Sequence, residues 1–144
     1  MPKKPDATVL AFDFGTRRIG VAMANTLTRV AHPLTTIDAP PTAARFEAIA
    51  ALIDEWQPAQ LVVGLPAHAD GTPHAMTARA KTFARALETR FALPVALVDE
   101  RFTTQAAVGA LAAAGRGGRA ERAARDAAAA QIILQQWLEA PHDR

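Results

Sequence analysis

Two short apolar runs near the start of the chain are separated by only three residues. The runs are 7–14 (ATVLAFDF) and 18–24 (RIGVAMA), and the segment Gly-Thr-Arg at 15–17 connects them. A connection this short is typical of a hairpin of two antiparallel strands. The start of the chain is therefore predicted to form an antiparallel sheet.

A third apolar run is predicted to extend this antiparallel sheet. It covers roughly residues 29–37 (RVAHPLTTI) and contains Pro33. Proline has no N–H to donate to a neighbouring strand, so it is confined to the edges of sheets. The third strand is therefore predicted to lie at the sheet edge.

Helical and strand patterns alternate along the rest of the chain. Apolar side chains first recur at spacings of three and four residues, which predicts a helix that begins at Thr42 and is ended by Pro58. Its apolar face consists of Phe46, Ile49, Ile53 and Trp56. The elements predicted to follow are a buried strand at 60–65, a helix at about 74–90, a strand at 94–98, a helix capped by Thr103 or Thr104, and a helix at about 120–139. Strands that alternate with helices pair in parallel, so the fold class is α/β, a mixed sheet with helices on both faces.

Length and composition limit the classes of protein that fit. The 144 residues are close to the ~150 typical of one domain, which predicts a single domain over 1–144 with flexible ends at 1–6 and 140–144. The absence of cysteine excludes disulfides, thiolate nucleophiles and cysteine-based zinc sites, and is typical of a reducing cytoplasm. No run reaches the ~18 apolar residues of a membrane span, and the N-terminus lacks a signal cleavage pattern. We therefore expect a cytoplasmic protein with no membrane partner.

Positive charge is concentrated in one place. The net charge of the chain is only +2, so attraction for a polyanion has to come from a local cluster. Four arginines fall within ten residues: Arg116, Arg119, Arg122 and Arg125. The cluster is interpreted either as a patch that grips phosphates or as a solvated loop and helix start in an arginine-rich chain. The residue types leave both interpretations open.

Carboxylates stand at the ends of two apolar strands. Asp13 lies near the end of the first strand (LAFDFG), and Asp99 and Glu100 follow directly on the last one. A buried carboxylate is costly unless a metal, a cation or solvent compensates it, and ligands of α/β sheets gather at the carboxyl ends of parallel strands. In the functional interpretation, one acid of the Asp99–Glu100 pair is a metal ligand while the other, bonded to Arg101, holds the turn. The structural alternatives are that Asp13 forms the following turn and that both acids of the pair hold theirs.

Asp126 breaks the apolar face of the last predicted helix. It shares a stripe with Ala130, Ile133 and Trp137, at spacings of 4, 7 and 11 residues. A carboxylate on a face that packs inward is not explained by packing. The alternative is an ordinary acidic residue near a helix N-terminus, where the helix dipole favours negative charge.

Carboxylates from an early strand, a late strand and the last helix would together offer only oxygen ligands. Such ligands suit Mg²⁺ or Mn²⁺, whereas zinc prefers histidine or cysteine. The histidines show no paired metal-ligand spacing; they are His32, His68, His74 and His142. Two metal ions held ~4 Å apart by carboxylates activate water and stabilise the leaving oxygen in phosphodiester hydrolysis. The pattern therefore favours nuclease chemistry.

Four segments together resemble the YqgF family. They are AFDFGTRRIGVAMAN, LVVGLPAHADG, LVDERFTTQAA and RDAAAAQIILQQWLE, and the resemblance covers about residues 8–139. Members of this family are ribonuclease H-like and are described as Holliday-junction resolvases and as nucleases that mature the 5′ end of pre-16S rRNA. The resemblance implies a ribonuclease H-like five-stranded sheet, with three antiparallel strands and then parallel strands, and a metal-dependent endonuclease.

The resemblance also assigns residues to roles. It implies that Asp13, Glu100 and Asp126 are the catalytic, metal-binding acids. We hypothesise that Asp13 bridges two Mg²⁺ or Mn²⁺ ions while Glu100 and Asp126 each complete one, delivering a water in line against the scissile phosphate. The residues predicted to contact nucleic acid are Arg17, Arg18, Arg101, Thr103, Thr104, Arg116, Arg119 and Arg122. Family members often have Asp where this chain has Asn25, which puts in doubt any fourth acid near the second strand.

Other functions stay open beside the processing of pre-16S rRNA. Symmetric resolution of a four-way DNA junction needs two active sites and hence a dimer, whereas RNA trimming needs only the monomer that we favour. A non-catalytic nucleic-acid-binding module would keep the fold and use only the basic loop. The segment DFGT followed by Gly20 also resembles the phosphate loop of actin-like ATPases, but those proteins need two such domains.

Overall fold

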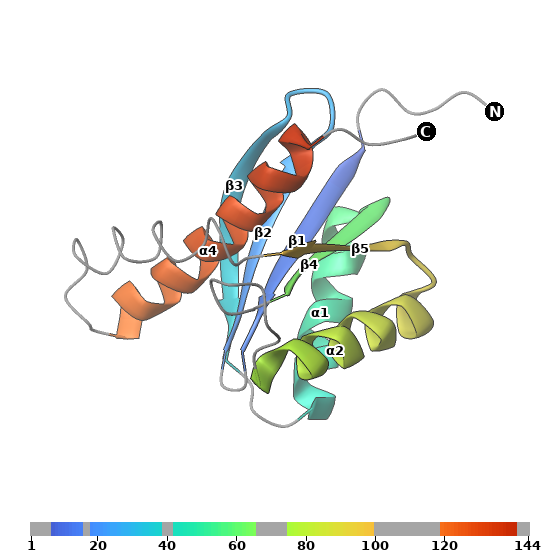
Figure 1. Ribbon diagram of the computed structural model, residues 1–144, viewed down its shortest axis with the longest axis vertical. Coiled ribbons are helices and arrows are strands. Elements are labelled where there is room, and N and C mark those ends of the chain that lie inside the picture. Colours follow the sequence, from blue (N-terminus) through green and yellow to red (C-terminus); the bar gives the residue numbers. More distant parts are fainter. Residues whose placement is uncertain (1–6, 16–17, 39–41, 66–74, 100–118, 141–144) are drawn as a thin grey trace.

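The computed structural model describes residues 7–15, 18–38, 42–65, 75–99 and 119–140 (Figure 1). The predicted helix that follows the last strand, with its candidate caps Thr103 and Thr104, lies outside these residues. So do the segments 1–6 and 141–144, for which flexible ends are predicted.

The described elements alternate as predicted. The strands are β1 (Thr8–Phe14), β2 (Ile19–Asn25), β3 (Val30–Ile37), β4 (Gln60–Leu65) and β5 (Val95–Asp99), and the helices are α1 (Thr42–Trp56), α2 (Ala75–Phe91) and α4 (Arg119–Glu139). Each predicted element that falls within the described residues is therefore confirmed, with only small differences at its ends. Among these helices, none is long and apolar enough to cross a membrane.

The five strands form one mixed sheet in the order β3-β2-β1-β4-β5. The pairs β1–β2 and β2–β3 are antiparallel, and the pairs β1–β4 and β4–β5 are parallel. This confirms the predicted fold class. Pro33 lies in the edge strand β3, opposite Ala22 and next to an irregularity of the β2–β3 register. The proline is tolerated there because the edge strand needs fewer hydrogen bonds.

Helices cover both faces of the sheet, with α4 on one face and α1 and α2 on the other (Figure 1). The alternation of side chains along β1 supplies both layers of core. Leu10 and Phe12 pack with α1 and α2, whereas Val9 and Ala11 pack with α4. All four side chains are fully buried. The face on which a residue of β1 lies can therefore be read from its place in this alternation.

Helix α4 is fixed to β3 by two glutamines. The side-chain nitrogen of Gln131 donates to the carbonyl oxygen of Ala31 at 3.0 Å, and the N–H of Ala31 donates to Oε1 of Gln135 at 2.9 Å. The nitrogen of Gln135 also donates to the carbonyl oxygen of Arg29 at 3.2 Å. The backbone groups of Ala31 would otherwise lie unpaired at an open sheet edge. These bonds both satisfy that edge and set the position of α4 along the sheet.

Candidate active site

The carboxyl ends of three parallel strands meet at one edge of the sheet. Strand β1 ends at Phe14, β4 at Leu65 and β5 at Asp99, and these strands are adjacent and parallel. This is the edge at which α/β sheets bind their ligands. Asp13, the second-last residue of β1, lies at it. Because β1 also pairs in parallel with β4, the topology places Asp13 at the carboxyl edge of a parallel pair of strands.

Asp13 lies on the sheet face that α4 covers. It follows Val9 and Ala11 in the alternation of β1, and both of those residues belong to the core beneath α4. Its partner across the β1–β2 pair is Gly20. Residues that lie directly opposite each other in a sheet project to the same face, with Cβ atoms about 5 Å apart. The Asp13 side chain therefore starts beside the backbone of Gly20, under α4.

Gly20 allows α4 to approach the sheet at Asp126. A Cβ atom at position 20 would lie 1.9 Å from the carbonyl oxygen of Asp126 and 3.1 Å from the backbone nitrogen of Ala127. Helix and strand backbones are thus in direct contact at a point where a side chain has no room. Because Gly20 is also the partner of Asp13, this contact brings Asp13 and Asp126 to the same place from positions far apart in the sequence.

The inward-facing stripe of α4 is confirmed. Ala130 and Ile133 are fully buried and Trp137 packs against the same core, while Asp126 begins the stripe at the end nearest the carboxyl edge. The Asp126 side chain remains 24% exposed. It is therefore buried enough to be oriented by its neighbours and accessible enough to meet a ligand.

Arg18 holds Asp126 in an ion pair. The Nε of Arg18 lies 2.5 Å from Oδ2 of Asp126, with side-chain exposures of 28% and 24%. The hydrogen bond to Asp126 and its negative charge raise the pKa of Arg18 above its ordinary value. A group whose pKa is raised on folding contributes stability at every pH below its unfolded pKa. The pair is therefore not broken by deprotonation of Arg18 anywhere in the neutral range.

We expect Arg18→Gln to cost about 1 kcal/mol of unfolding free energy, because the pair is only partly shielded from water. Urea denaturation of Arg18→Gln, Asp126→Asn and the double variant measures the coupling between the two side chains. A coupling near 1 kcal/mol is expected, since contacting charged residues act together. Strictly additive single effects would contradict a stabilising pair.

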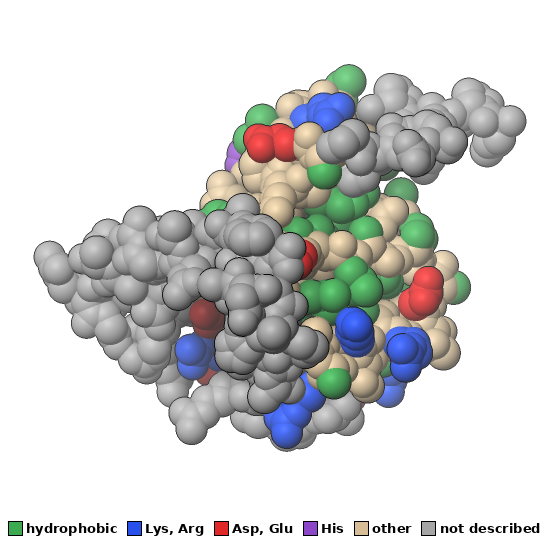
Figure 2. All heavy atoms as spheres, viewed as in Figure 1, with side chains coloured by type: hydrophobic (Ala, Val, Ile, Leu, Met, Phe, Trp, Pro, Cys, Tyr) green, Lys and Arg blue, Asp and Glu red, His purple; other side chains and the backbone are tan. Residues whose placement is uncertain are grey.

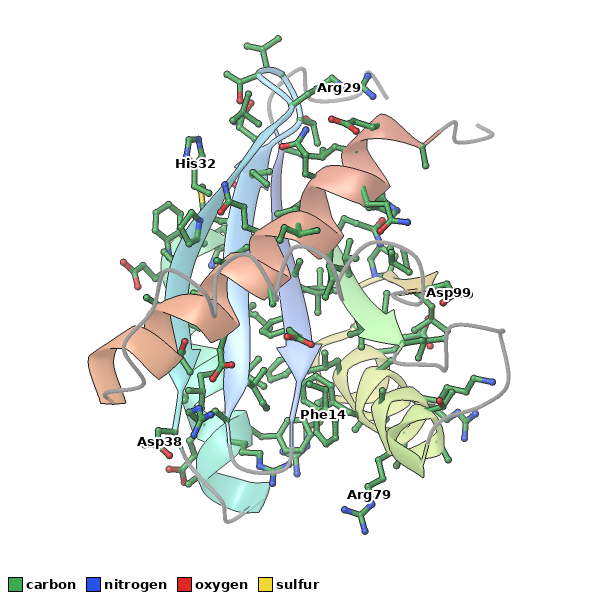
Figure 3. All side chains as sticks on the ribbon, turned by 60° about the vertical axis from the view of Figure 1, so that its left-hand side comes forward. Phe14, Arg29, His32, Asp38, Arg79 and Asp99 are labelled. Carbon is green, nitrogen blue, oxygen red and sulfur yellow. The ribbon has the colours of Figure 1, made fainter. Side chains whose placement is uncertain are left out.

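Asp99 does not share the face of Asp13. Ala96 and Val98 of β5 pack with the core beneath α4, so the alternation of the strand directs Asp99 to the opposite face. Strand β4 also separates β5 from β1, and Figure 3 shows Asp99 well apart from Phe14 at the end of β1. Asp99 is therefore the weaker candidate of the Asp99–Glu100 pair for a site shared with Asp13.

Asn25 lies at the far end of the β1–β2 hairpin from Asp13. It is paired with Thr8, the first residue of β1. Its Oδ1 accepts a hydrogen bond of 2.8 Å from the N–H of Leu27 in the turn between β2 and β3. Asn25 thus has a turn-forming role, and an acid at this position would not join a site at the carboxyl edge.

Several predicted site residues have no described position. Glu100, Arg17, Arg101, Thr103, Thr104 and Arg116 lie outside the described residues. Arg119 and Arg122 fall in the first turns of α4, but their side chains are likewise not described. The structure therefore brings together Asp13, Asp126 and Arg18 of the predicted set.

The acids at this edge have the donor chemistry that a divalent metal needs. Asp13 and Asp126 offer carboxylate oxygens, which suit Mg²⁺ or Mn²⁺. Within the described ranges, no group of three or more histidine, cysteine or acidic side chains could hold a metal ion. The pair therefore fits as part of an oxygen-donor set that requires at least one further acid.

Two features of the site were not predicted from the sequence. The partner of Arg18 was expected to be a phosphate, and the structure shows Asp126 instead; no sequence signal links residues 108 positions apart. The close approach at Gly20 did have a signal, because a glycine inside an apolar strand indicates that another backbone comes near.

Comparisons with known proteins identify a family and similar chains. The family model described as "RuvX: Holliday junction resolvase" matches residues 7–140. A candidate pre-16S rRNA nuclease of Dechloromonas aromatica (strain RCB) is 56% identical over 135 residues, which span 94% of this chain and 92% of the relative. Another candidate pre-16S rRNA nuclease, of Nitrosomonas europaea, is 54% identical over 142 residues, spanning 99% and 96%.

A solved structure shares the fold. T. thermophilus RuvC in complex with a Holliday junction substrate aligns with a TM-score of 0.58 over 91% of this chain and 93% of that one. The sequence identity is 13%, so this likeness concerns the arrangement of helices and strands alone.

Proposed function

This chain belongs to the RuvX family of proteins described as Holliday junction resolvases, and from that premise we propose that it is a metal-dependent endonuclease that cuts precursor 16S ribosomal RNA during maturation of its 5′ end. The match confirms the predicted resemblance to the YqgF family. The names of relatives at 56% and 54% identity favour the RNA substrate. The observation that carries the proposal is that Asp13 and Asp126 both lie next to Gly20 at the carboxyl edge, Asp13 as its strand partner and Asp126 through its backbone.

The proposed metal site consists of Asp13, Asp126 and Glu100. A bound pair of Mg²⁺ or Mn²⁺ ions would lower the pKa of an attacking water and neutralise charge on the scissile phosphate. Asp13 projects from a rigid central strand and Asp126 from a helix in backbone contact with its neighbour. Both carboxylates are thereby held in place before substrate arrives, which avoids the cost of ordering them during the reaction.

We propose two roles for Arg18: it orients the carboxylate of Asp126, and it contacts a phosphate of the substrate. Its Nε holds Oδ2 of Asp126, which leaves Oδ1 of that carboxylate as the atom to offer a metal ion. A guanidinium carries five N–H donors, so its terminal nitrogens can reach a phosphate oxygen while Nε keeps its partner. Further phosphate contacts are proposed for Arg17, Arg101, Thr103, Thr104, Arg116, Arg119 and Arg122.

A four-way DNA junction is the second candidate substrate, because the family model carries the resolvase description. Symmetric resolution of a junction needs two active sites and so a dimer. For the RNA reaction we propose that the protein acts as a monomer in the cytoplasm. We also propose that the chain forms a single domain.

The proposal is tested by offering both substrates to the same protein preparation. A precursor 16S rRNA fragment and a synthetic four-way DNA junction are incubated with Mg²⁺, Mn²⁺ or EDTA, and products are resolved on denaturing gels. We expect cleavage of the RNA with either metal and none in EDTA. Cleavage of the junction alone would transfer the assignment to a resolvase. Binding without cleavage of either would favour a non-catalytic module.

A further inference from the structure

A hollow opens between α1 and α2, on the sheet face opposite Asp13. It has a volume of about 430 Å³ and contains Phe14 of β1, Phe46 of α1 and Phe83 of α2. Phe14 directly follows Asp13, and successive residues of a strand project to opposite faces. The hollow, called here the α1–α2 pocket, therefore lies at the same carboxyl edge as the candidate active site, around the end of the same strand.

The pocket exists because α2 carries small side chains where it faces α1. Ala78, Thr82 and Ala86 recur every four residues and form one wall, since residues four apart share one side of a helix. The neighbouring stripe of α2 carries Phe83, which is only 5% exposed and packs into the core. The stripe of α2 that carries Phe83 thus packs against the sheet, and the neighbouring stripe of small side chains leaves a hollow beside it.

Aromatic rings form the floor of the pocket. The ring centroids of Phe14 and Phe83 are 4.8 Å apart with an interplanar angle of 32°, and those of Phe46 and Phe83 are 6.0 Å apart at 33°. Such a floor favours stacking of a flat ring, and base–aromatic stacking tolerates any base because every base has a π-face. Phe14 is the most accessible of the three rings, being only partly buried.

Two arginines also line the pocket, one of them over the aromatic floor. The guanidinium carbon of Arg45 lies 5.6 Å from the centroid of the Phe14 ring, and Arg79, which is exposed, projects from the first part of α2 beyond Phe14 (Figure 3). Helix α2 carries four basic residues against one acid, Glu88, and Figure 2 shows Lys and Arg side chains gathered over this side of the molecule. A ligand with a flat ring at one end and a negative charge at the other fits both the aromatic floor and the two arginines.

We propose that the α1–α2 pocket takes one unpaired nucleotide of the RNA that is cut, with the base over the Phe14–Phe83 floor and a phosphate at Arg45 and Arg79. The inference rests on the proposed function, because only a nuclease that cuts RNA at this edge of the sheet would have an RNA strand passing the pocket. A base inside a duplex has neighbours stacked on both faces and cannot enter, so the pocket selects RNA that is single-stranded beside the scissile phosphate.

The pocket is tested by binding in EDTA, which separates it from cleavage. Fluorescence anisotropy with a labelled single-stranded RNA is measured for Arg79→Glu and for the matched control Arg85→Glu. Both residues are exposed on α2 and both changes alter the charge equally, but Arg85 does not line the pocket. We expect Arg79→Glu to weaken binding about tenfold through loss of a charge-assisted phosphate contact, and Arg85→Glu by about twofold or less.

A second variant tests whether the RNA needs the open volume of the pocket, without a change of charge. Thr82→Met lengthens a wall residue without a change of charge, and an exposed helix position accommodates it. We expect weaker binding of single-stranded RNA and unchanged binding of an RNA duplex. Equal effects of Arg79→Glu and Arg85→Glu, or wild-type binding by Thr82→Met, would overturn the pocket.

The two proposals can fail separately. If these variants bind as expected but no precursor RNA is cut, the pocket stands and the nuclease assignment falls. If precursor RNA is cut but the variants bind RNA as the wild type does, the nuclease assignment stands and the pocket falls.

Discussion

Asp13→Asn is expected to reduce cleavage of precursor 16S rRNA by about a thousandfold or more. The change replaces a carboxylate with a neutral amide of nearly the same shape at the end of β1, where Asp13 and Asp126 both lie next to Gly20. A metal-dependent phosphodiesterase that loses a charged ligand loses transition-state stabilisation of several kcal/mol. Single-turnover cleavage under Mg²⁺ measures the loss, and anisotropy in EDTA measures nucleic-acid binding, which is expected to persist.

Asp99→Asn is the matched control for this prediction. Asp99 also ends a parallel strand at the carboxyl edge, but it is exposed and lies on the other face of the sheet. We expect its cleavage rate to stay within about threefold of wild type, since the residue does not share the site of Asp13. A fully active Asp13→Asn variant, or equal damage from both variants, would refute the assignment of Asp13.

Gly20→Ala is expected to destabilise the protein by at least about 3 kcal/mol, a large fraction of the stability of a small domain. The added methyl would lie 1.9 Å from the carbonyl oxygen of Asp126 and 2.4 Å from its carbonyl carbon. Both are backbone atoms of a helix, which cannot rotate away as a side chain can. An ordinary contact begins at 3.4 Å, so α4 would have to move by about 1.5 Å or the strand would have to bend.

Urea denaturation measures this effect, and Ala22→Gly serves as its comparison. Ala22 lies two residues further along β2, on the same face and fully buried. Removal of its methyl is expected to cost only about 1 kcal/mol. If Gly20→Ala proves as stable as wild type, α4 does not rest against β2 as described. Where a folded fraction of Gly20→Ala survives, its cleavage rate is expected to fall as well, because Asp126 moves with the helix.

The sequence predicts most of this fold because its signals are local. The short loop after β1 determines a hairpin, Pro33 determines an edge strand, and the apolar stripe of α4 determines which side of that helix packs inward. Each of these depends on residues within a few positions of one another. Local patterns of this kind also identified Asp13 and Asp126 as acids in places that packing alone does not explain.

Contacts between distant segments account for what could not be predicted. The pairing of Arg18 with Asp126 joins residues 108 positions apart, and the α1–α2 pocket draws on three separate elements. The position of Asp99 on the face opposite Asp13 depends on the alternation of β5, which the burial of Ala96 and Val98 shows. Glu100 itself stays a prediction, as do the phosphate-binding residues beyond the described ranges.

The bonds from Gln131 and Gln135 to β3 have a consequence for the distant end of α4. Asp126 lies nine residues before Gln135, which corresponds to about 13.5 Å along a helix. If the residues of α4 that make these bonds were shifted by one position along the helix, Asp126 would move by about 1.5 Å and rotate by about 100° around the helix axis, away from Asp13. The two glutamine amides at one end of the sheet therefore determine where the carboxylate of Asp126 lies at the other end.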